Sequence, residues 1–423
     1  MTGPSAGRTW RDLAWNLFYS GLTNGSAALL LILLIVAGRT LGDAEYGKFS
    51  YALALATIFE TLMDFGLNQV TVRAIARDRA RAGSVMANAL GLKLIWAALA
   101  MVVLFTVATL LRPEPDVRLA CYLLGGSSLI RSYVLTVRGV FQGLERFGWE
   151  SLIVGADRLL LVVLGSSALM AGAGLRGLAL TFLVSRAITL ALAALFVRVQ
   201  MGSVGVAFDR TVWRELQRAA VPFGVFMIIL NLYAYIDTIL LGVMRTNVET
   251  GWYSAAYRVY EGLTYAPALI AAVLTPRLSQ LFVTDLRHHG RLARLAMGVS
   301  VGLAIVIGGT GYLVAAPLLR LLFGSAFVPA ATALRILAGG AVFVFAIWIL
   351  HAVAISADRE TLLLKTGVVG LVVNVGCNLY LIPRLGIDGA AWATVIGEAI
   401  SAGMLIAGLT IGAPGARRRI SSS

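Results

Sequence analysis

The stretch TGWYSAAYRVYEGL (residues 250–263) repeats a pattern found earlier in the chain, in YGKFSYALALATIF (residues 46–59). Gly47 of the earlier stretch recurs as Gly251 in the later one, at an offset of 204 residues in a chain of 423. This spacing of about half the chain predicts a molecule built from two similar halves. The other shared positions are Phe49 and Tyr253, Ser50 and Ser254, and Ala52 and Ala256.

The composition predicts that the protein lies in a membrane. Hydrophobic residues make up 59% of the chain and charged residues 13%, whereas soluble domains carry roughly 25% charged residues. Cys121 and Cys377 each stand alone in an apolar run, which excludes a disulfide framework or a cysteine metal site. The first residues, MTGPSAGRTWRDLAW, lack the apolar core and cleavage site of a signal peptide. We therefore expect the first hydrophobic segment to be retained.

Twelve segments are long enough to cross a membrane as helices, which takes about 20 mostly apolar residues. The loops between them are too short to hold a folded soluble domain. The least apolar segment contains GGSSLIRSY. The sequence thus predicts an all-α integral membrane protein. The expected spans lie near 14–37, 47–69, 85–110, 119–138, 151–172, 177–197, 219–243, 252–275, 295–319, 329–352, 363–383 and 388–411.

The placement of Lys and Arg predicts the orientation of these spans. Counted over alternate loops and the termini, 21 basic residues fall on one side of the membrane and 7 on the other. Cytoplasmic loops carry the excess of Lys and Arg, so we expect both termini to be cytoplasmic. The net charge of +14 is therefore a topology signal that also attracts anionic lipid headgroups. Nucleic acid is not an expected partner, because no stacking aromatics accompany the basic residues.

The repeat and the span count together predict two six-helix lobes, at 1–205 and 206–423. An even number of spans gives both copies the same topology, which relates them by a pseudo-two-fold axis along the membrane normal. Some secondary transporters have this arrangement, with the substrate site between the halves. Further matches between the halves are VTVR (70–73) with LTPR (274–277), and GLRGLALTFLVSRAI (174–188) with GIDGAAWATVIGEAI (386–400).

The order of these motifs resembles polysaccharide flippases of the Wzx type, in the multidrug/oligosaccharidyl-lipid/polysaccharide (MOP) exporter superfamily. The resemblance covers essentially the whole chain. The motifs that carry it are R-x-LG-x-x-x-YG-x-FSYALA from Arg39, DFGLNQVTVR (64–73), the segment from VPFG to TPRLS (221–279), LRIL (334–337) and GIDGAAWAT (386–394).

The resemblance implies transport of a polyprenyl-diphosphate-linked oligosaccharide for cell-surface polysaccharide assembly. Undecaprenyl is the carrier lipid it implies. The lipid would move from the inner to the outer leaflet of a bacterial or archaeal cell membrane, by alternating access in a V-shaped bundle. A monomer could carry out this transport by itself. Twelve spans favour this type over lipid II flippases, which usually have two extra helices. Neither an enzyme activity nor a cofactor is expected.

Charged side chains inside the expected spans are the candidate substrate ligands, because each costs about 2.5–3.5 kcal/mol at a helix centre. Arg131 and Arg335 occupy matching repeat positions and could form a fork on phosphate oxygens, although Arg335 could instead snorkel to the surface. Arg258 and Glu261 lie on one helical face, either walling the transport path or forming an internal ion pair. The further candidates are Lys48, Arg186 and Tyr257.

Polar residues in the first helix of each half are candidates for lining a hydrated cavity. Asn16 and Asn24 lie eight residues apart, and Asn231 occupies the seventh span. Their alternative role is hydrogen bonding between helices, worth roughly 0.6 kcal/mol per bond in a membrane.

Three acids are candidates for binding a coupling ion, H⁺ or Na⁺. Glu60 and Asp64 are four residues apart in the second span, and Asp237 lies in the seventh. No wider ligand set accompanies them, so no resident metal is expected.

Three other functions compete with a flippase. A cation-coupled multidrug exporter of the same superfamily would need an acidic, aromatic pocket, whereas the spans hold seven basic and six acidic residues. An integral-membrane glycosyltransferase or polymerase would need catalytic acids or metal ligands in a substantial loop, and the chain has no Asp-x-Asp pattern. A purely structural membrane protein would not explain the embedded acids.

Overall fold

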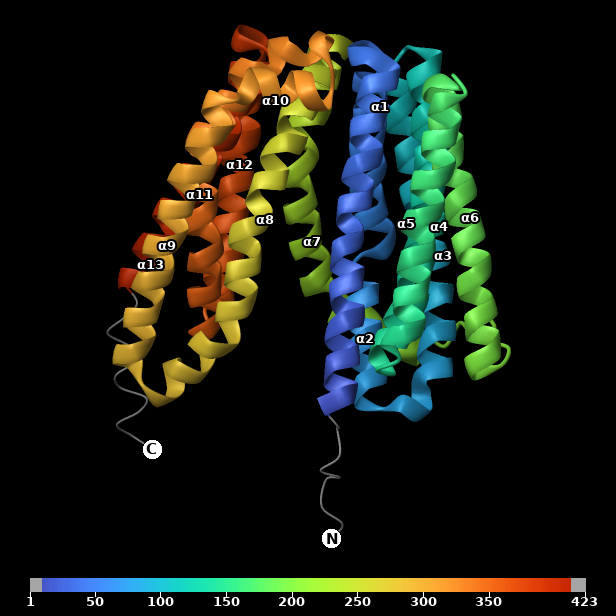
Figure 1. The fold of residues 1–423 in the computed structure, drawn as a ribbon. Coiled ribbons are helices and arrows are strands. Elements are labelled where there is room, and N and C mark those ends of the chain that lie inside the picture. Colours follow the sequence, from blue (N-terminus) through green and yellow to red (C-terminus); the bar gives the residue numbers. More distant parts are fainter. Residues whose placement is uncertain (1–9, 412–423) are drawn as a thin grey trace. The chain divides into compact units, whose positions relative to one another are not determined.

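The computed structural model describes the backbone of residues 10–411 and the side chains of residues 29–410, and all regular structure in this part is helical (Figure 1). Every expected span lies largely within helical segments, and the prediction of an all-α membrane protein with about twelve spans is confirmed. The helices are α1 (Trp10–Asp64), α2 (Leu67–Arg77), α3 (Ala82–Leu111), α4 (Pro115–Gly143), α5 (Phe147–Met170), α6 (Gly174–Met201), α7 (Arg210–Met244), α8 (Asn247–Thr284), α9 (Leu286–Leu313), α10 (Ala315–Leu322), α11 (Ala331–Ser356), α12 (Glu360–Leu385) and α13 (Ile387–Ile411).

Helix α1 holds the first expected span and most of the second. Its backbone leaves helical geometry at Gly42, where φ is 74° and ψ is 176°. Glycine adopts such a positive φ without a steric cost because it has no side chain. Gly42 therefore separates the two spans.

The first compact unit, unit 1, comprises the described residues up to Leu41 and Ala52–Ile228, and it is organised around α4. This helix packs against α2, α3, α5 and α6. Val137 of α4 belongs to a buried apolar cluster with Ile153 of α5 and Ala193 of α6. The polar stretch GGSSLIRSY lies on this central helix. Its small residues therefore contact neighbouring helices rather than lipid, and they allow these helices to pack closely.

The second unit, unit 2, comprises Gly42–Tyr51 and the described residues from Ile229 onward, and it is organised around α11. This helix packs against α8, α9 and α13, and α12 packs against α13. A Cβ atom at Gly340 of α11 would lie 2.5 Å from the Val395 side chain of α13, so glycine permits this close approach. Helices α4 and α11 are the fourth and tenth expected spans. The two units are thus organised around corresponding helices of the repeat.

The beginnings of the two copies of the repeated phrase pack directly against each other within unit 2. A Cβ atom at Gly47 would lie 1.7 Å from the carbonyl oxygen of Asn247, and one at Gly251 would lie 2.1 Å from that of Asp43. Any side chain at either position would collide with backbone. The shared glycines are therefore the residues that let the two phrases touch.

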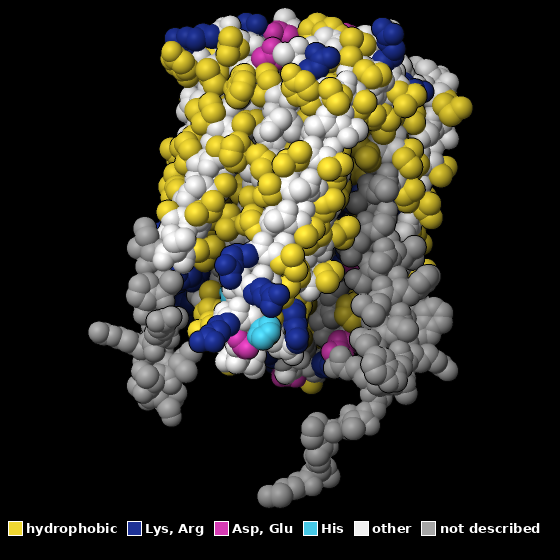
Figure 2. Space-filling model, turned by 60° about the vertical axis from the view of Figure 1, so that its left-hand side comes forward, with side chains coloured by type: hydrophobic (Ala, Val, Ile, Leu, Met, Phe, Trp, Pro, Cys, Tyr) yellow, Lys and Arg dark blue, Asp and Glu magenta, His cyan; other side chains and the backbone are white. Residues whose placement is uncertain are grey.

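The surface has the pattern of a membrane protein. Nine of the described helices are long and apolar enough to cross a membrane, and these do not include α1 or α4. On the face in Figure 2, hydrophobic side chains cover the middle, whereas Lys and Arg gather near the two ends. Exposed residues of α9 illustrate the apolar middle: Leu295, Ile305 and Val306 are 64–66% exposed. The chain is a multi-pass membrane protein.

Candidate functional site

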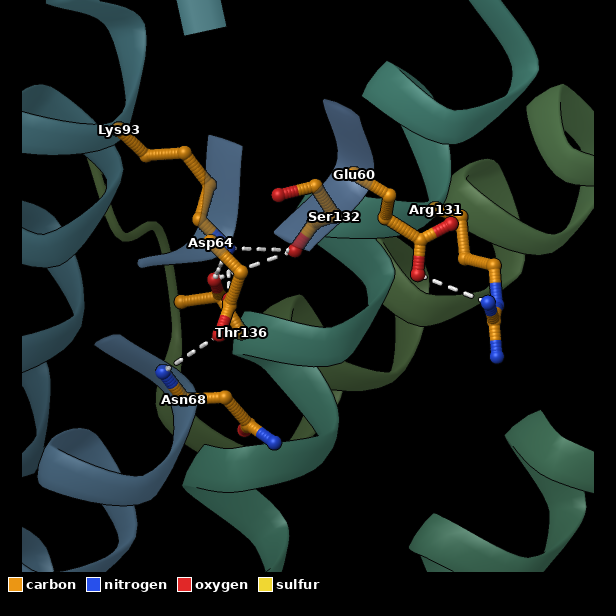
Figure 3. A network of polar contacts seen from close by, with 7 residues as sticks. All are labelled: Glu60, Asp64, Asn68, Lys93, Arg131, Ser132 and Thr136. Carbon is orange, nitrogen blue, oxygen red and sulfur yellow. Dashed lines mark hydrogen bonds and ion pairs between the residues drawn. The ribbon is translucent and has the colours of Figure 1, made fainter. Parts of the chain in front are cut away.

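The candidate ligand Arg131 forms an ion pair in unit 1. Its Nη1 atom lies 2.7 Å from Oε1 of Glu60, which sits near the end of α1 (Figure 3). The Arg131 side chain is 28% exposed and that of Glu60 is 11% exposed. One candidate for substrate binding and one for ion binding therefore neutralise each other in this structure.

The other acid of the pair, Asp64, is bound to Lys93 of α3 (Figure 3). The Lys93 side chain is fully buried, and its ammonium group donates three hydrogen bonds. The acceptors are Oδ1 of Asp64 at 2.8 Å, the carbonyl oxygen of Ser132 at 2.6 Å and Oγ1 of Thr136 at 2.7 Å. All three ammonium protons are satisfied, as a buried lysine requires.

A third ion pair in unit 1 joins Arg186 of α6 to Asp157 of α5. Both side chains are buried, with that of Arg186 only 5% exposed. Asp157 and Arg158 are adjacent in sequence and point about 100° apart around the helix. Asp157 is the one of the two that meets the neighbouring helix α6. Arg186 therefore pairs within unit 1 in this structure.

In unit 2, the buried carboxylate of Asp237 on α7 is held by neutral groups only. It is 2% exposed and accepts hydrogen bonds from the Tyr253 hydroxyl at 2.7 Å, the Thr394 hydroxyl at 2.6 Å and the Asn378 amide at 2.6 Å. These donors come from α8, α13 and α12. No cation pairs with Asp237 among the described residues, so its negative charge is hydrogen-bonded without being neutralised.

The Arg258 and Glu261 side chains form the ion pair that their spacing predicts, with 2.6 Å between Nη1 and Oε2. The Arg258 guanidinium also lies 5.8 Å from the centre of the Tyr235 ring. Tyr257 stacks against the Tyr253 ring, with 5.9 Å between ring centres. A row of tyrosines thus lies beside the ion pair on α8.

The remaining candidates are less closely defined. Lys48, Asn231 and Arg335 are half-buried, and among the described residues Arg335 has no hydrogen bond or ion pair. Asn16 and Asn24 lie outside the residues whose side chains the structure describes. Within the described part no cluster of His, Cys, Asp and Glu could hold a metal ion.

Sequence reasoning missed the partners that complete these networks. Lys93 stands out as a lone charge in an apolar run, but its acceptors lie 29 to 43 residues away. Thr136 and Thr394 give no signal, because a threonine in a membrane helix usually bonds its own backbone. The long-range partners become visible only once the helices are packed.

Comparison with known proteins places the chain in a family. The model of the family described as "Polysaccharide biosynthesis protein" matches residues 11–282, more than half of the chain. A "Probable flippase AglR" from Haloferax volcanii is 26% identical over 178 residues, which are 39% of this chain and 35% of that protein. The chain thus matches about a third of the length of this curated relative.

Solved structures share the fold. A lipid II flippase MurJ in an inward closed conformation superimposes with a TM-score of 0.78 at 12% identity, covering 93% of this chain and 87% of that one. An inward-facing multidrug resistance MATE family transporter of the MOP superfamily gives a TM-score of 0.74 at 18% identity, covering 95% and 94%. The expected MOP fold is confirmed. The chain belongs to the polysaccharide biosynthesis protein family of membrane proteins.

Proposed function

We propose that this protein is a flippase that moves a polyprenyl-diphosphate-linked oligosaccharide from the cytoplasmic to the outer leaflet by alternating access. Membership of the polysaccharide biosynthesis protein family, the flippase relative and the MOP fold all support this proposal. Cell-surface polysaccharide assembly in a bacterial or archaeal cell membrane would consume the product. The excess of Lys and Arg on one side supports cytoplasmic termini.

The observation that carries the proposal is the state of Arg131. Arg131 lies inside an expected span, and its guanidinium pairs with Glu60. The Arg131 side chain is 28% exposed. Arg186, by contrast, is 5% exposed and locked to Asp157. An exposed guanidinium can exchange a carboxylate for a diphosphate, because both interactions are charge-assisted and allow two parallel hydrogen bonds. Arg131 is therefore the ligand we assign first to the diphosphate, with Arg258 second.

Asp237 is the candidate we favour for the coupling ion, H⁺ or Na⁺. Glu60 and Asp64 already face the cations Arg131 and Lys93. Asp237 is the acid among the three whose neighbours are all neutral. A monovalent cation entering beside it would not have to displace a positive side chain.

Leaflet exchange in proteoliposomes tests the proposal. A fluorescent polyprenyl-diphosphate oligosaccharide is added, and its transfer between leaflets is followed for the wild type, Arg131→Ala and a control, Arg320→Ala. Arg320 is exposed and has no partner among the described residues, which makes it a matched arginine. We expect exchange by the wild type and the control, and a decrease of roughly ten- to a hundredfold in Arg131→Ala, because a charge-assisted contact contributes about 1.5–3 kcal/mol.

A wild type that shows no exchange under any imposed ion gradient would contradict the proposal. Efflux of an organic cation under the same gradients would then identify the protein as a multidrug exporter, which shares its fold. Because Arg131→Ala leaves Glu60 without its cation, the double variant Arg131→Ala, Glu60→Gln separates loss of the ligand from loss of folding. It should unfold near the wild-type temperature and still fail to transport.

A further inference from the structure

A second buried carboxyl group lies in unit 2, close to Asp237 in the packing. Glu398 of α13 is 4% exposed and follows Thr394, the donor to Asp237, by four residues. Residues four apart share a helix face. On α8, Tyr260 contacts Glu398 and lies seven residues after Tyr253, which contacts Asp237. The two carboxyl groups therefore lie in succession along the interface between α8 and α13.

The two acids differ in how many donors they receive. Asp237 accepts hydrogen bonds from three side chains. Glu398 receives one, the Tyr260 hydroxyl, which lies 2.7 Å from Oε1 and 2.8 Å from Oε2. No cation pairs with Glu398 among the described residues. A buried carboxylate without a cation and with a single donor is costly, and a negative Asp237 close by adds repulsion.

The other groups that face Glu398 are neutral. The rings of Tyr257 and Tyr260, both on α8, have their centres 6.0 Å apart. The Tyr233 hydroxyl of α7 is buried and has no hydrogen-bond partner among the described residues. It lies 3.1 Å from where a Cβ atom on Gly397 would be, next to Glu398 in the chain. From helix α12, the neutral Asn374 lies beside the same glycine, Gly397. From helix α11, Gly340 packs against the apolar side chain of Val395 on α13.

We propose that Glu398 is a proton-binding site, with the Tyr260 hydroxyl donating to one carboxyl oxygen and the proton held on the other. The binding step joins one proton from water to the carboxylate and needs no other reactant. In transport, Glu398 would bind a coupling proton at a place separate from Asp237. This role rests on the flippase function proposed above.

Infrared spectroscopy of the reconstituted protein tests the site directly. A protonated carboxyl group has a carbonyl stretch that a carboxylate lacks, and that moves in heavy water. At neutral pH, the difference between the wild type and Glu398→Gln should contain this band. As the pH is raised, the band disappears when Glu398 loses its proton. In Asp237→Asn, which lacks the neighbouring negative charge, this loss should occur at a pH about one unit or more below that of the wild type. In Tyr260→Phe, which lacks the donor to the carboxylate, the band should persist to higher pH.

Leaflet exchange under a pH gradient provides the second readout. Exchange by the wild type should respond to the gradient, and Glu398→Gln should lose this response. Absence of the carboxyl band at neutral pH would overturn the proton site. A band that is present, combined with an unchanged gradient response in Glu398→Gln, would overturn its role in coupling. If the wild type moves no lipid at all, the infrared result still decides the site, so the two proposals fail separately.

Discussion

The buried acids of the two units are compensated in opposite ways. In unit 1, Glu60, Asp64 and Asp157 each meet a basic side chain. In unit 2, Asp237 and Glu398 meet only hydroxyl and amide groups. A buried ion pair neutralises its charges internally, whereas an acid that meets only neutral donors either keeps its negative charge or takes up a cation or a proton. Under the proposed function, this difference favours Arg131 of unit 1 as a ligand for an anion and the acids of unit 2 as ligands for a cation.

The largest expected effect comes from breaking an ion pair in unit 1. Lys93→Met should lower the free energy of unfolding by about 3–5 kcal/mol, because Asp64 would lose its buried cation. Thermal unfolding in detergent micelles measures the loss. The double variant Lys93→Met, Asp64→Leu removes both charges and should recover most of the stability. A single variant as stable as the wild type would show that the pair does not compensate Asp64.

Cation binding should stabilise unit 2 and not unit 1. If a coupling ion binds at Asp237, raising its concentration to 100 times the dissociation constant adds about 2.7 kcal/mol of stability. Unfolding temperatures at rising Na⁺, and separately at falling pH, measure this gain for the wild type and for Asp237→Asn. We expect the variant to lose the gain, whereas a variant of Glu60 should keep it. An equal response in Asp237→Asn would place the ion elsewhere.

Removing one neutral donor in unit 2 should have a smaller effect. Thr394→Val keeps the shape of the side chain and removes one of the three hydrogen bonds to Asp237. We expect a loss of roughly 1.5 kcal/mol of stability in detergent, as for a hydrogen bond to a charged group. Thr410→Val, at a hydroxyl that bonds only its own helix backbone, is the control. Equal losses in both variants would count against a special role for Thr394.

The smallest effect is expected at the half-exposed pair on α8. Glu261 is 40% exposed, so Glu261→Gln should change stability by roughly 1 kcal/mol at most. Its effect should instead be seen in transport, because Arg258 would be released toward an anion. A large loss of stability would make Arg258 and Glu261 a structural pair and remove Arg258 from the proposed ligands.

Most helices could be predicted from the sequence, because a helix that crosses a bilayer needs about 20 mostly apolar residues. An apolar segment of that length is easily recognised in a sequence. Helix α4 is the weakest case, because its polar GGSS stretch leaves it outside the nine described helices that are apolar enough to cross a membrane. The pair of Arg258 and Glu261 was also predictable, since both partners lie on one helical turn. The close packing of Gly47 against α8 was not expected, although the repeat had singled out both phrases.

The partners of the buried acids could not be predicted in the same way. Tyr260 and Glu398 are 138 residues apart, and Asp237 and Thr394 are 157 apart. Tyrosine and threonine occur throughout membrane helices, so no local pattern marks the few that reach a carboxylate. The sequence can therefore identify which charges need a partner inside the membrane, while only helix packing decides whether that partner is a cation or a hydroxyl.

Transport of two substrates by the wild type in the same proteoliposomes distinguishes a flippase from a multidrug exporter. One is a polyprenyl-diphosphate oligosaccharide, and the other is a lipophilic organic cation. We expect leaflet exchange of the diphosphate-linked glycan and no efflux of the cation, because the partly exposed Arg131 side chain can bind an anionic diphosphate. Efflux of the cation without exchange of the glycan would contradict it.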